Sequence, residues 1–191
     1  MRFVNEQQLD LPVLIKESAR GNRETFRVLF EHLQDRLFRY SLSRVTSRED
    51  ALDVVQESFV DLWRALSRFR YRSEEEFYGF VFTIVKRRLV KYYRARRNSV
   101  PLDDTFIDEN FFLPREDYRY LNQWITHLKP VHQEILRLRY WSDLSFKDIA
   151  VTLAMSEGAA KVSHHRALKK LTFFAQQHES YSRRTTETFT D

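Results

Sequence analysis

The segment at residues 144–171 constrains the fold most, because its pattern predicts two short helices joined by a tight turn. Ser145 is a candidate N-cap of the first helix, and Ser156 of the second. One face of the second helix, at helical spacing, consists of Ala160, His164, Ala167 and Leu171. The opposite face is basic, as in compact domains that place one helix in the major groove of DNA. A plain helical hairpin with a solvated basic face is the alternative, since spacing alone supports only a hypothesis.

The composition favours an all-α protein without cysteine chemistry. The chain has 191 residues, of which only 3 are Gly and 4 are Pro, and 42% are hydrophobic, which is enough for packed cores. The absence of Cys excludes a disulfide framework and thiolate metal sites. No apolar run reaches the roughly 20 residues that cross a bilayer, and residues 1–10 lack the apolar core of a signal peptide. We therefore expect a cytoplasmic protein without membrane insertion, and we expect no cofactor and no metal.

Charge is segregated along the chain, whose formal net charge is +5. Lys and Arg outnumber Asp and Glu in residues 1–97 and again in residues 118–178, whereas residues 98–117 are acidic and contain two prolines. Basic domains commonly bind phosphate groups, because binding releases the counterions of the nucleic acid. We expect two basic domains, an extended acidic linker at 98–117, and a disordered tail at 179–191 that is rich in Ser, Thr and Arg.

The helix expected at about residues 47–67, with Ser47 as a candidate N-cap, has an apolar face and an acidic face. Its apolar residues, centred on Val55, are Ala51, Phe59, Leu62 and Leu66. The opposite side carries Asp50, Asp53, Glu57, Asp61 and Arg64, with Gln56 and Trp63 at the boundary. A solvated outer face explains these acids most simply. An acidic stripe in an otherwise basic domain also suits a docking surface for a basic protein partner.

The next expected helix, at about residues 75–97, is basic, and its part from residue 81 onward contains no acid. One line along it consists of Thr83, Arg87, Lys91 and Arg94, opposite an apolar line of Val81, Val85, Leu89 and Tyr92. Because like charges one turn apart repel, this ridge favours an external anion, and we expect nucleic acid. The preceding loop, with Arg70, Tyr71, Arg72 and Ser73, suits phosphates and an unpaired base, or else ordinary packing.

Taken together, these features resemble the extracytoplasmic-function (ECF) sigma factors, a bacterial subfamily of the sigma-70 family of RNA polymerase sigma factors. The segment DALDVVQESF at residues 50–59 resembles that family's DAEDLVQEXF signature, and Trp63 follows where an aromatic residue is usual. Residues 77–97 are similar to the family's next helix, and residues 144–171 to its C-terminal domain. The resemblance implies an all-α fold of two small helical domains, a region 2-like helical bundle and a region 4-like helix-turn-helix domain, joined by an extended acidic linker.

The resemblance also implies a transcription initiation factor, not an enzyme. Such a factor binds the β′ clamp helices and the β flap of core RNA polymerase, directs the polymerase to specific promoter DNA and helps to melt the minus-ten element. An anti-sigma factor is a further implied partner. The implied polymerase-binding residues are Asp50, Asp53, Gln56, Glu57 and Trp63. The implied minus-ten residues are Arg70, Tyr71, Arg72, Ser73, Thr83, Arg87, Lys91 and Arg94. The implied minus-thirty-five residues are Lys161, Val162, His165 and Arg166.

The sequence departs from the family pattern in its DNA-facing helices. The usual Trp, Asn and Asp of the ridge helix appear as Phe80, Arg87 and Lys91, so this face is more basic than is typical. Ala154 replaces the usual turn glycine, and we expect His164 to pack against the core. A stand-alone helix-turn-helix regulator is the nearest alternative, but it would not need the acidic helix. An enzyme has little support, since the chain has neither a glycine-rich phosphate loop nor a cysteine nucleophile.

Overall fold

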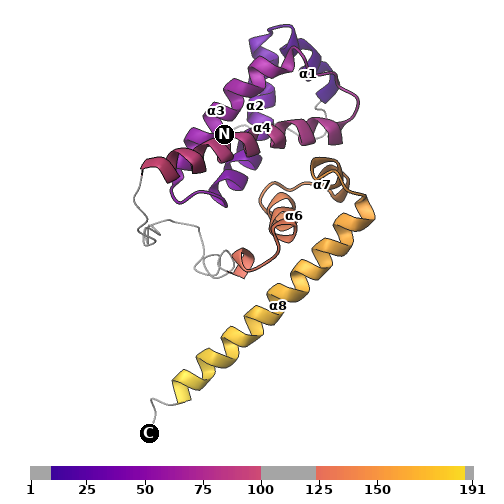
Figure 1. Cartoon of the computed structure of the whole chain (residues 1–191). Coiled ribbons are helices and arrows are strands. Elements are labelled where there is room, and N and C mark those ends of the chain that lie inside the picture. The colour runs from indigo at the N-terminus through magenta and orange to yellow at the C-terminus, as the bar shows by residue number, and fades with distance from the viewer. Residues whose placement is uncertain (1–9, 100–123, 188–191) are drawn as a thin grey trace.

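The computed structural model describes residues 10–99 and 124–187, and the regular elements of these residues are all α-helices (Figure 1). The N-terminal bundle consists of α1 (Leu11–Ala19), α2 (Arg23–Leu42), α3 (Arg48–Leu66) and α4 (Glu74–Ser99). The C-terminal half contains α6 (Pro130–Tyr140), α7 (Phe146–Thr152) and α8 (Glu157–Glu187). The predicted all-α fold is therefore confirmed.

Capping side chains set the starts of several helices, among them α3, α7 and α8. The Ser47 side chain accepts a hydrogen bond from the backbone N–H of Asp50 at 3.0 Å and so begins α3. Ser145 and Asp148 cap α7 reciprocally, because each side chain accepts from the backbone N–H of the other residue. Ser156 accepts from a backbone N–H in the first turn of α8 at 3.1 Å. The predicted caps at Ser47, Ser145 and Ser156 are confirmed.

Three described residues between helices use left-handed backbone, namely Gly21, Asp143 and Ala154. Gly21, which follows the end of α1, has a φ of 92°, which a residue without Cβ adopts readily. The tight turn between α7 and α8 passes through Ala154, whose φ is 52°. That conformation costs a residue with a Cβ about 1–2 kcal/mol, so the capped helices on both sides must hold the turn in place.

The core of the bundle is built from the apolar faces that the helical periodicity predicts. The buried residues of the predicted face of α3 are Ala51, Val55, Phe59, Leu62 and Leu66. Those of α4 are Val81, Val85 and Leu89. Tyr40 of α2 is fully buried and meets Phe82 of α4 edge to face, with 5.2 Å between the ring centroids. The opposite faces of α3 and α4 are therefore the ones that solvent and partners can reach.

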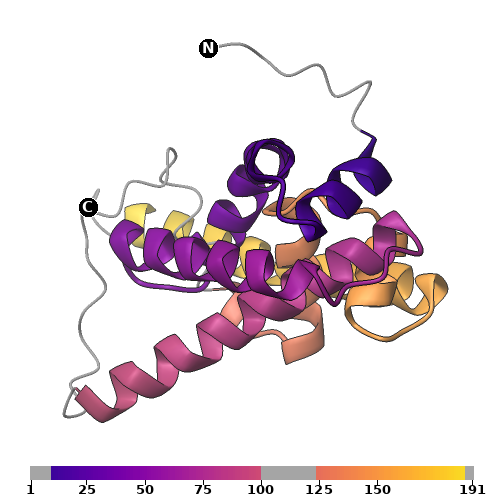
Figure 2. The same cartoon turned by 90° about the horizontal axis from the view of Figure 1, so that it is seen from above.

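The C-terminal half packs directly on the N-terminal bundle. In both Figure 1 and Figure 2, α7 lies against the first part of α4. The C-terminal residues that join the core of the bundle are Ile135, Leu138, Leu144, Ile149 and Ala160. A smaller cluster that joins α6 to α8 consists of Ile125, Leu128, Leu136, Ala167 and Leu171. The two halves that the charge pattern separates along the chain thus share one core in space.

Two boundaries differ from the sequence-based expectation. Helix α4 continues to Ser99, so it includes the start of the segment expected as the linker at 98–117, the rest of which lies outside the described residues. Helix α8 continues to Glu187, so residues 179–187, expected to be disordered, extend the helix instead. No Gly or Pro follows Gly158 within α8, and the sequence therefore contains no strong signal that would end the helix earlier.

Candidate nucleic-acid and protein interfaces

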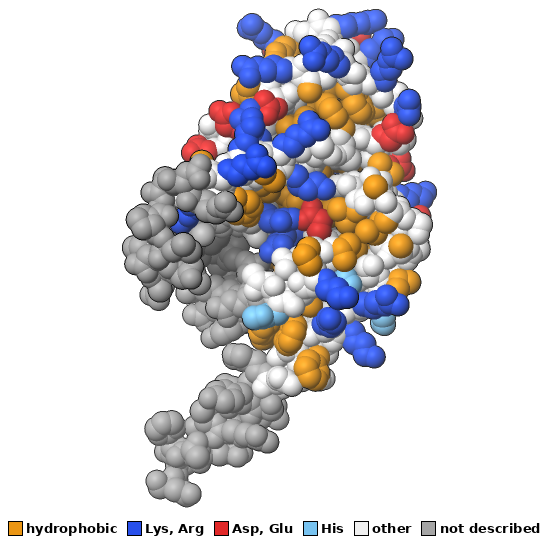
Figure 3. All heavy atoms as spheres, in the orientation of Figure 1, with side chains coloured by type: hydrophobic (Ala, Val, Ile, Leu, Met, Phe, Trp, Pro, Cys, Tyr) orange, Lys and Arg blue, Asp and Glu red, His pale blue; other side chains and the backbone are white. Residues whose placement is uncertain are grey.

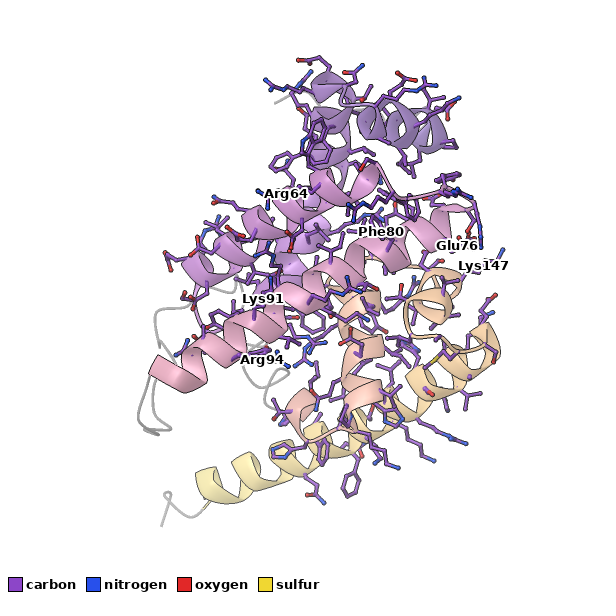
Figure 4. All side chains as sticks on the ribbon, turned by 45° about the horizontal axis from the view of Figure 1, so that its top comes forward. Arg64, Glu76, Phe80, Lys91, Arg94 and Lys147 are labelled. Carbon is purple, nitrogen blue, oxygen red and sulfur yellow. The ribbon has the colours of Figure 1, made fainter. Side chains whose placement is uncertain are left out.

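The outer face of α4 carries a row of exposed cations, which consists of Arg87, Lys91 and Arg94. Figure 4 shows Lys91 and Arg94 beyond Phe80 along this helix. Within residues 10–99 and 124–187, no hydrogen bond or ion pair engages these three side chains. Thr83, predicted to lie in the same row, is half-buried and donates its hydroxyl to the Gly79 backbone oxygen at 2.7 Å. The row thus presents positive charge that an external polyanion can bind.

Other cations of α4 have partners on α3. The Arg88 guanidinium contacts Glu57 at 2.7 Å and Asp61 at 2.5 Å. The hydrogen bond from Arg88 holds the pKa of Asp61 below its ordinary value. Tyr92 likewise donates to Asp50 at 2.9 Å. Arg88 lies outside the predicted ridge, so its neutralisation within the protein leaves the ridge cations Arg87, Lys91 and Arg94 available to an external anion.

A cavity of about 720 Å³ opens between α3 and α4. Its lining residues are Asp61, Arg64, Ala65, Arg68, Phe69, Arg70, Phe80, Ile84 and Arg87. Phe69 and Phe80 stack at an interplanar angle of 21° with 4.5 Å between their ring centroids. Aromatic rings beside several cations suit an unpaired base and its phosphates. The sequence patterns did not assign Arg64 or Arg68 to a DNA site, because only the packing of α3 on α4 brings them beside Phe80 and the loop.

The loop before α4 contributes unevenly to this cavity. Arg70 is exposed and lines it, whereas Tyr71 packs half-buried against the core, and this burial raises the pKa of its hydroxyl. Arg72 lies 3.9 Å from Glu76. Ser73 accepts a hydrogen bond from the backbone N–H of Glu76 at 3.2 Å and helps to start α4. The structure therefore brings Arg70 to the cavity and gives the other three predicted loop residues local contacts.

The acidic residues of α3 border a second, smaller groove of about 260 Å³. Its lining residues are Asp50, Asp53, Val54, Glu57, Arg88, Lys91, Tyr92 and Ala95. Asp53, Gln56 and Glu57 are exposed on this side of the bundle. Trp63 is instead half-buried against Phe26 of α2, with 4.8 Å between the ring centroids. The structure thus brings the predicted acids Asp50, Asp53 and Glu57 together at one groove, and Trp63 packs against α2.

The first part of α8 exposes the predicted reading face. Its exposed residues include Lys161, Val162, His165 and Arg166. Lys161 forms an ion pair with Glu157 one turn earlier, at 2.6 Å. His164 is half-buried: its Nε2 lies 3.0 Å from the hydroxyl of the exposed Tyr140, and its ring meets Phe146, which packs on the core, at 5.1 Å between centroids. Burial lowers the pKa of His164, with Arg139 and His165 adding to the effect. The expectation that His164 packs against the core is confirmed.

Positive charge lies on both halves of the molecule. On the face in Figure 3, Lys and Arg side chains cover much of the N-terminal bundle and gather again over the C-terminal half, with few acids among them. Such a distribution favours polyanionic partners. Among the helices at residues 10–99 and 124–187, none combines the length and apolar character that a bilayer span requires.

Two family models match the chain. The Sigma-70 region 2 model matches residues 29–99, and the Sigma-70, region 4 model matches residues 118–171. The ECF RNA polymerase sigma-E factor of Haemophilus influenzae is 26% identical over 178 residues, which cover 84% of this chain and 93% of that relative. ShbA of Streptomyces griseus, also an ECF sigma factor, is 27% identical over 86% of this chain and 94% of its own length. BldN of Streptomyces coelicolor is 25% identical over 83% of this chain, which spans only 63% of that relative.

Two solved structures are similar in fold. CnrH in complex with the cytosolic domain of CnrY has a TM-score of 0.68 and 22% identity, covering 87% of this chain and 97% of that one. The sigma factor RpoE from Bartonella quintana, in complex with the anti-sigma factor NepR, has a TM-score of 0.59 and 20% identity, covering 79% of this chain and 96% of that one.

Proposed function

The chain belongs to the ECF subfamily of the sigma-70 family, and from this premise we propose that it binds core RNA polymerase, directs the polymerase to specific promoters and helps to melt the minus-ten element. One observation carries the proposal. A single chain presents an acidic face on α3, an exposed cationic row beside an aromatic cavity on α4, and an exposed basic face on α8. A stand-alone helix-turn-helix regulator would need only the last of these surfaces.

The polymerase contact belongs on the outer face of α3. Asp53, Gln56 and Glu57 are exposed there, and acids attract a basic partner surface before close contact forms. The family pattern assigns this helix to the β′ clamp helices, and the C-terminal half to the β flap. Glu57 pairs with Arg88 at 2.7 Å while its side chain remains exposed. Arg88 also pairs with Asp61, so Glu57 can turn to a cation of the polymerase without leaving Arg88 unpaired.

The minus-ten contact belongs on α4 and the adjoining cavity. Phe69 and Phe80 offer aromatic surface to an unpaired base, and Arg64, Arg68 and Arg70 supply charge for its phosphates. Stacking a base on an aromatic ring contributes about 1–3 kcal/mol. Each captured base thus offsets part of the free energy of strand separation, so that binding alone can drive local melting.

The minus-thirty-five contact belongs on α8. Lys161 and His165 can donate to base edges in the major groove, and the exposed Val162 can contact a thymine methyl group. Arg166 lies next to them and suits a phosphate. The ion pair between Lys161 and Glu157 is exposed, so DNA can displace it.

The proposed activity places the protein in the cytoplasm, where polymerase and promoter DNA are found. We also propose an anti-sigma factor as a regulatory partner. Support comes from the fold shared with the Bartonella quintana sigma factor that was solved with NepR.

In vitro transcription with core RNA polymerase and a library of genomic fragments tests the proposal. We expect initiation at discrete sites that core polymerase alone does not use. Initiation should fall when Asp53, Gln56 and Glu57 are replaced together by Ala. If the purified protein supports no initiation at any site, although it binds DNA, the stand-alone regulator becomes the better description.

A further inference from the structure

The cavity between α3 and α4 has two helical walls and a loop at one end. The wall from α4 consists of Phe80, Ile84 and Arg87, which share one face of that helix at helical spacing. The wall from α3 consists of Asp61, Arg64, Ala65 and Arg68, and the loop adds Phe69 and Arg70. Figure 4 labels Arg64 on the α3 wall and Phe80 on the α4 wall. A ligand in the cavity therefore meets both helices at once.

The four arginines of the cavity can only donate hydrogen bonds. Arg64, Arg68, Arg70 and Arg87 are all exposed. Between residues 10 and 99 and between 124 and 187, no hydrogen bond or ion pair engages their guanidinium groups. A guanidinium has five N–H donors and no acceptor, and it stays protonated in proteins. The cavity thus offers a ligand many donors with fixed positive charge.

The acceptors beside this cavity are already occupied. The Asp61 carboxylate lines it, but Oδ2 accepts from Arg88 Nε and Oδ1 pairs with Arg88 Nη2, each at 2.5 Å. At the end of α3, the backbone oxygen of Ala65 accepts from the N–H of Arg68 at 3.1 Å. The backbone oxygen of Leu66 accepts from the N–H of Phe69 at 3.0 Å. An amino group of a ligand would therefore find few acceptors here.

The four DNA bases differ in how well they suit such a cavity. Guanine has two adjacent acceptors, O6 and N7, on one edge. Adenine and cytosine carry an amino donor, at N6 and N4, and thymine has O4 beside a methyl group. Cytosine also has the acceptors N3 and O2, but its amino group lies next to them. Because a donor that loses water without gaining a partner weakens binding, the cavity disfavours adenine and cytosine.

We propose that this cavity selects guanine as the unpaired base and that Arg87 reads its O6 and N7 through two parallel hydrogen bonds. The proposal rests on the proposed function, in which the cavity captures a base of the melted strand. Arg87 shares a face of α4 with Phe80, so it can reach the edge of a base that stacks on this ring. Its charge still lies next to the strand, where it also attracts phosphates.

The other arginines suit the phosphates on either side of the base. Arg64 and Arg68 lie on the opposite wall, and Arg70 lies on the loop. Asn is the usual residue of the family where this chain has Arg87, and its side-chain oxygen could accept from a base amino group. Arg87 removes that acceptor. This departure from the family pattern therefore narrows the choice of base to one with adjacent acceptors.

Binding of pre-melted DNA to the holoenzyme tests the base preference. The DNA is a promoter mapped by in vitro transcription, and abasic sites placed at successive minus-ten positions locate the captured base by loss of affinity. There we expect guanine to bind at least about tenfold more tightly than adenine, cytosine or thymine. Hypoxanthine keeps O6 and N7 but lacks the 2-amino group, and it should bind within about twofold of guanine. 7-Deazaguanine lacks the N7 acceptor and should bind at least about fivefold more weakly.

Two variants of Arg87 test its assigned role. Arg87→Lys keeps the charge but loses the planar pair of donors, so the preference for guanine over 7-deazaguanine should fall below about twofold. Its affinity for the abasic DNA should stay within about twofold of the wild type. Arg87→Asn adds a side-chain acceptor and should raise the affinity for adenine and cytosine relative to guanine. Arg39→Lys changes an exposed cation of α2 in the same way and should keep the guanine preference.

The possible outcomes are distinct. Preference for another base, or equal binding of guanine and 7-deazaguanine, would overturn the proposal. A guanine preference that survives in Arg87→Lys would overturn the role of Arg87. If the wild-type chain supports no initiation, the proposed function fails. The free chain with the pentanucleotides TTXTT, where X is each base in turn, then decides the base preference, because α3, α4 and their loop alone line the cavity. Equal affinities for the four pentanucleotides would overturn the proposal.

Discussion

Two groups of charged side chains differ in where their partners come from. Those at the contact between the two halves pair within the protein, whereas some of those on the outer faces of the helices have no described partner. Glu134 is buried, and its partners Tyr40, Arg44 and Lys86 all come from the other half of the chain. Arg87 lies on an outer face, and no described acid pairs with it. A buried charge must be paired within the protein because burial removes its hydration, whereas water solvates an exposed charge until an external partner binds it. The buried cluster therefore supports structure, and the outer charges are available for binding.

Removal of the buried carboxylate should produce the largest effect. We expect Glu134→Ala to lower the free energy of unfolding by about 3–5 kcal/mol, because Arg44 and Lys86 lose their counter-charge in a buried site. Urea denaturation followed by circular dichroism measures this change. Glu49→Ala, which removes an exposed acid from α3, is the matched control and should change stability by less than about 0.5 kcal/mol. Equal effects of the two variants would erase the difference between buried and outer charges.

The acidic face of α3, unlike Glu134, should matter for binding and not for stability. Replacing Asp53, Gln56 and Glu57 together by Ala should leave stability nearly unchanged but weaken binding to core polymerase by about 10- to 100-fold. Fluorescence anisotropy with labelled protein measures the dissociation constant. Asp35→Ala, at an exposed acid of α2, serves as the control. Unchanged affinity of the triple variant would remove the polymerase contact from this face.

The outer face of α8 should determine which bases of the minus-thirty-five element the protein prefers. Lys161→Ala and His165→Ala should each cost about 1–3 kcal/mol of discrimination between promoter variants, because each loses a donor to a base edge. Transcription from a series of minus-thirty-five variants measures the preference. Lys169→Ala removes an exposed cation from the same helix and should leave the preference intact. A preference that survives both substitutions would mean that other residues read the element.

The outer row of cations on α4 should affect mainly how DNA binding depends on salt concentration. Each phosphate contact adds about one unit to the slope of log affinity against log salt, so Arg87→Ala/Lys91→Ala should make this slope shallower by about two units. Holoenzyme binding to a pre-melted minus-ten DNA, titrated at several salt concentrations, measures it. Arg39→Ala, an exposed cation of α2, is the control. An unchanged slope would place these two cations away from the DNA backbone.

The partly exposed pair between Arg88 and Asp61 should give the smallest effect. Because Arg88 lowers the pKa of Asp61 in the folded protein, the pair stabilises the fold above the ordinary carboxyl pKa, and this stabilisation is lost as pH falls through the lowered value. Asp61→Asn should therefore cost less than about 1 kcal/mol at pH 7, and less still at a pH below the ordinary carboxyl pKa. Denaturation at both pH values checks this. A cost that persists unchanged in acid would assign it to packing rather than charge.

Much of the local structure was predictable, whereas the contacts between distant segments were not. Ser47, Ser145 and Ser156 cap their helices as expected, because a cap depends on residues within one turn. The inward position of His164 also follows from helical spacing. The stacking of Phe69 on Phe80 could not be foreseen, since it depends on how α3 meets α4. Those contacts create the cavity, so only part of the candidate minus-ten site was visible in the sequence.

The helices, their apolar faces and the segregation of charge along the chain follow from the amino-acid sequence alone, because each of these depends on spacing within a few residues. The tertiary structure decided which charges remain available. Arg87 and Arg88 are neighbours in sequence, yet only Arg88 reaches acids of α3. Successive helical residues differ in direction by about 100°, and whether an acid lies in a given direction depends on a different helix. The same reason explains why Glu134 is a buried interdomain residue, although nothing in its own neighbourhood marks it as one.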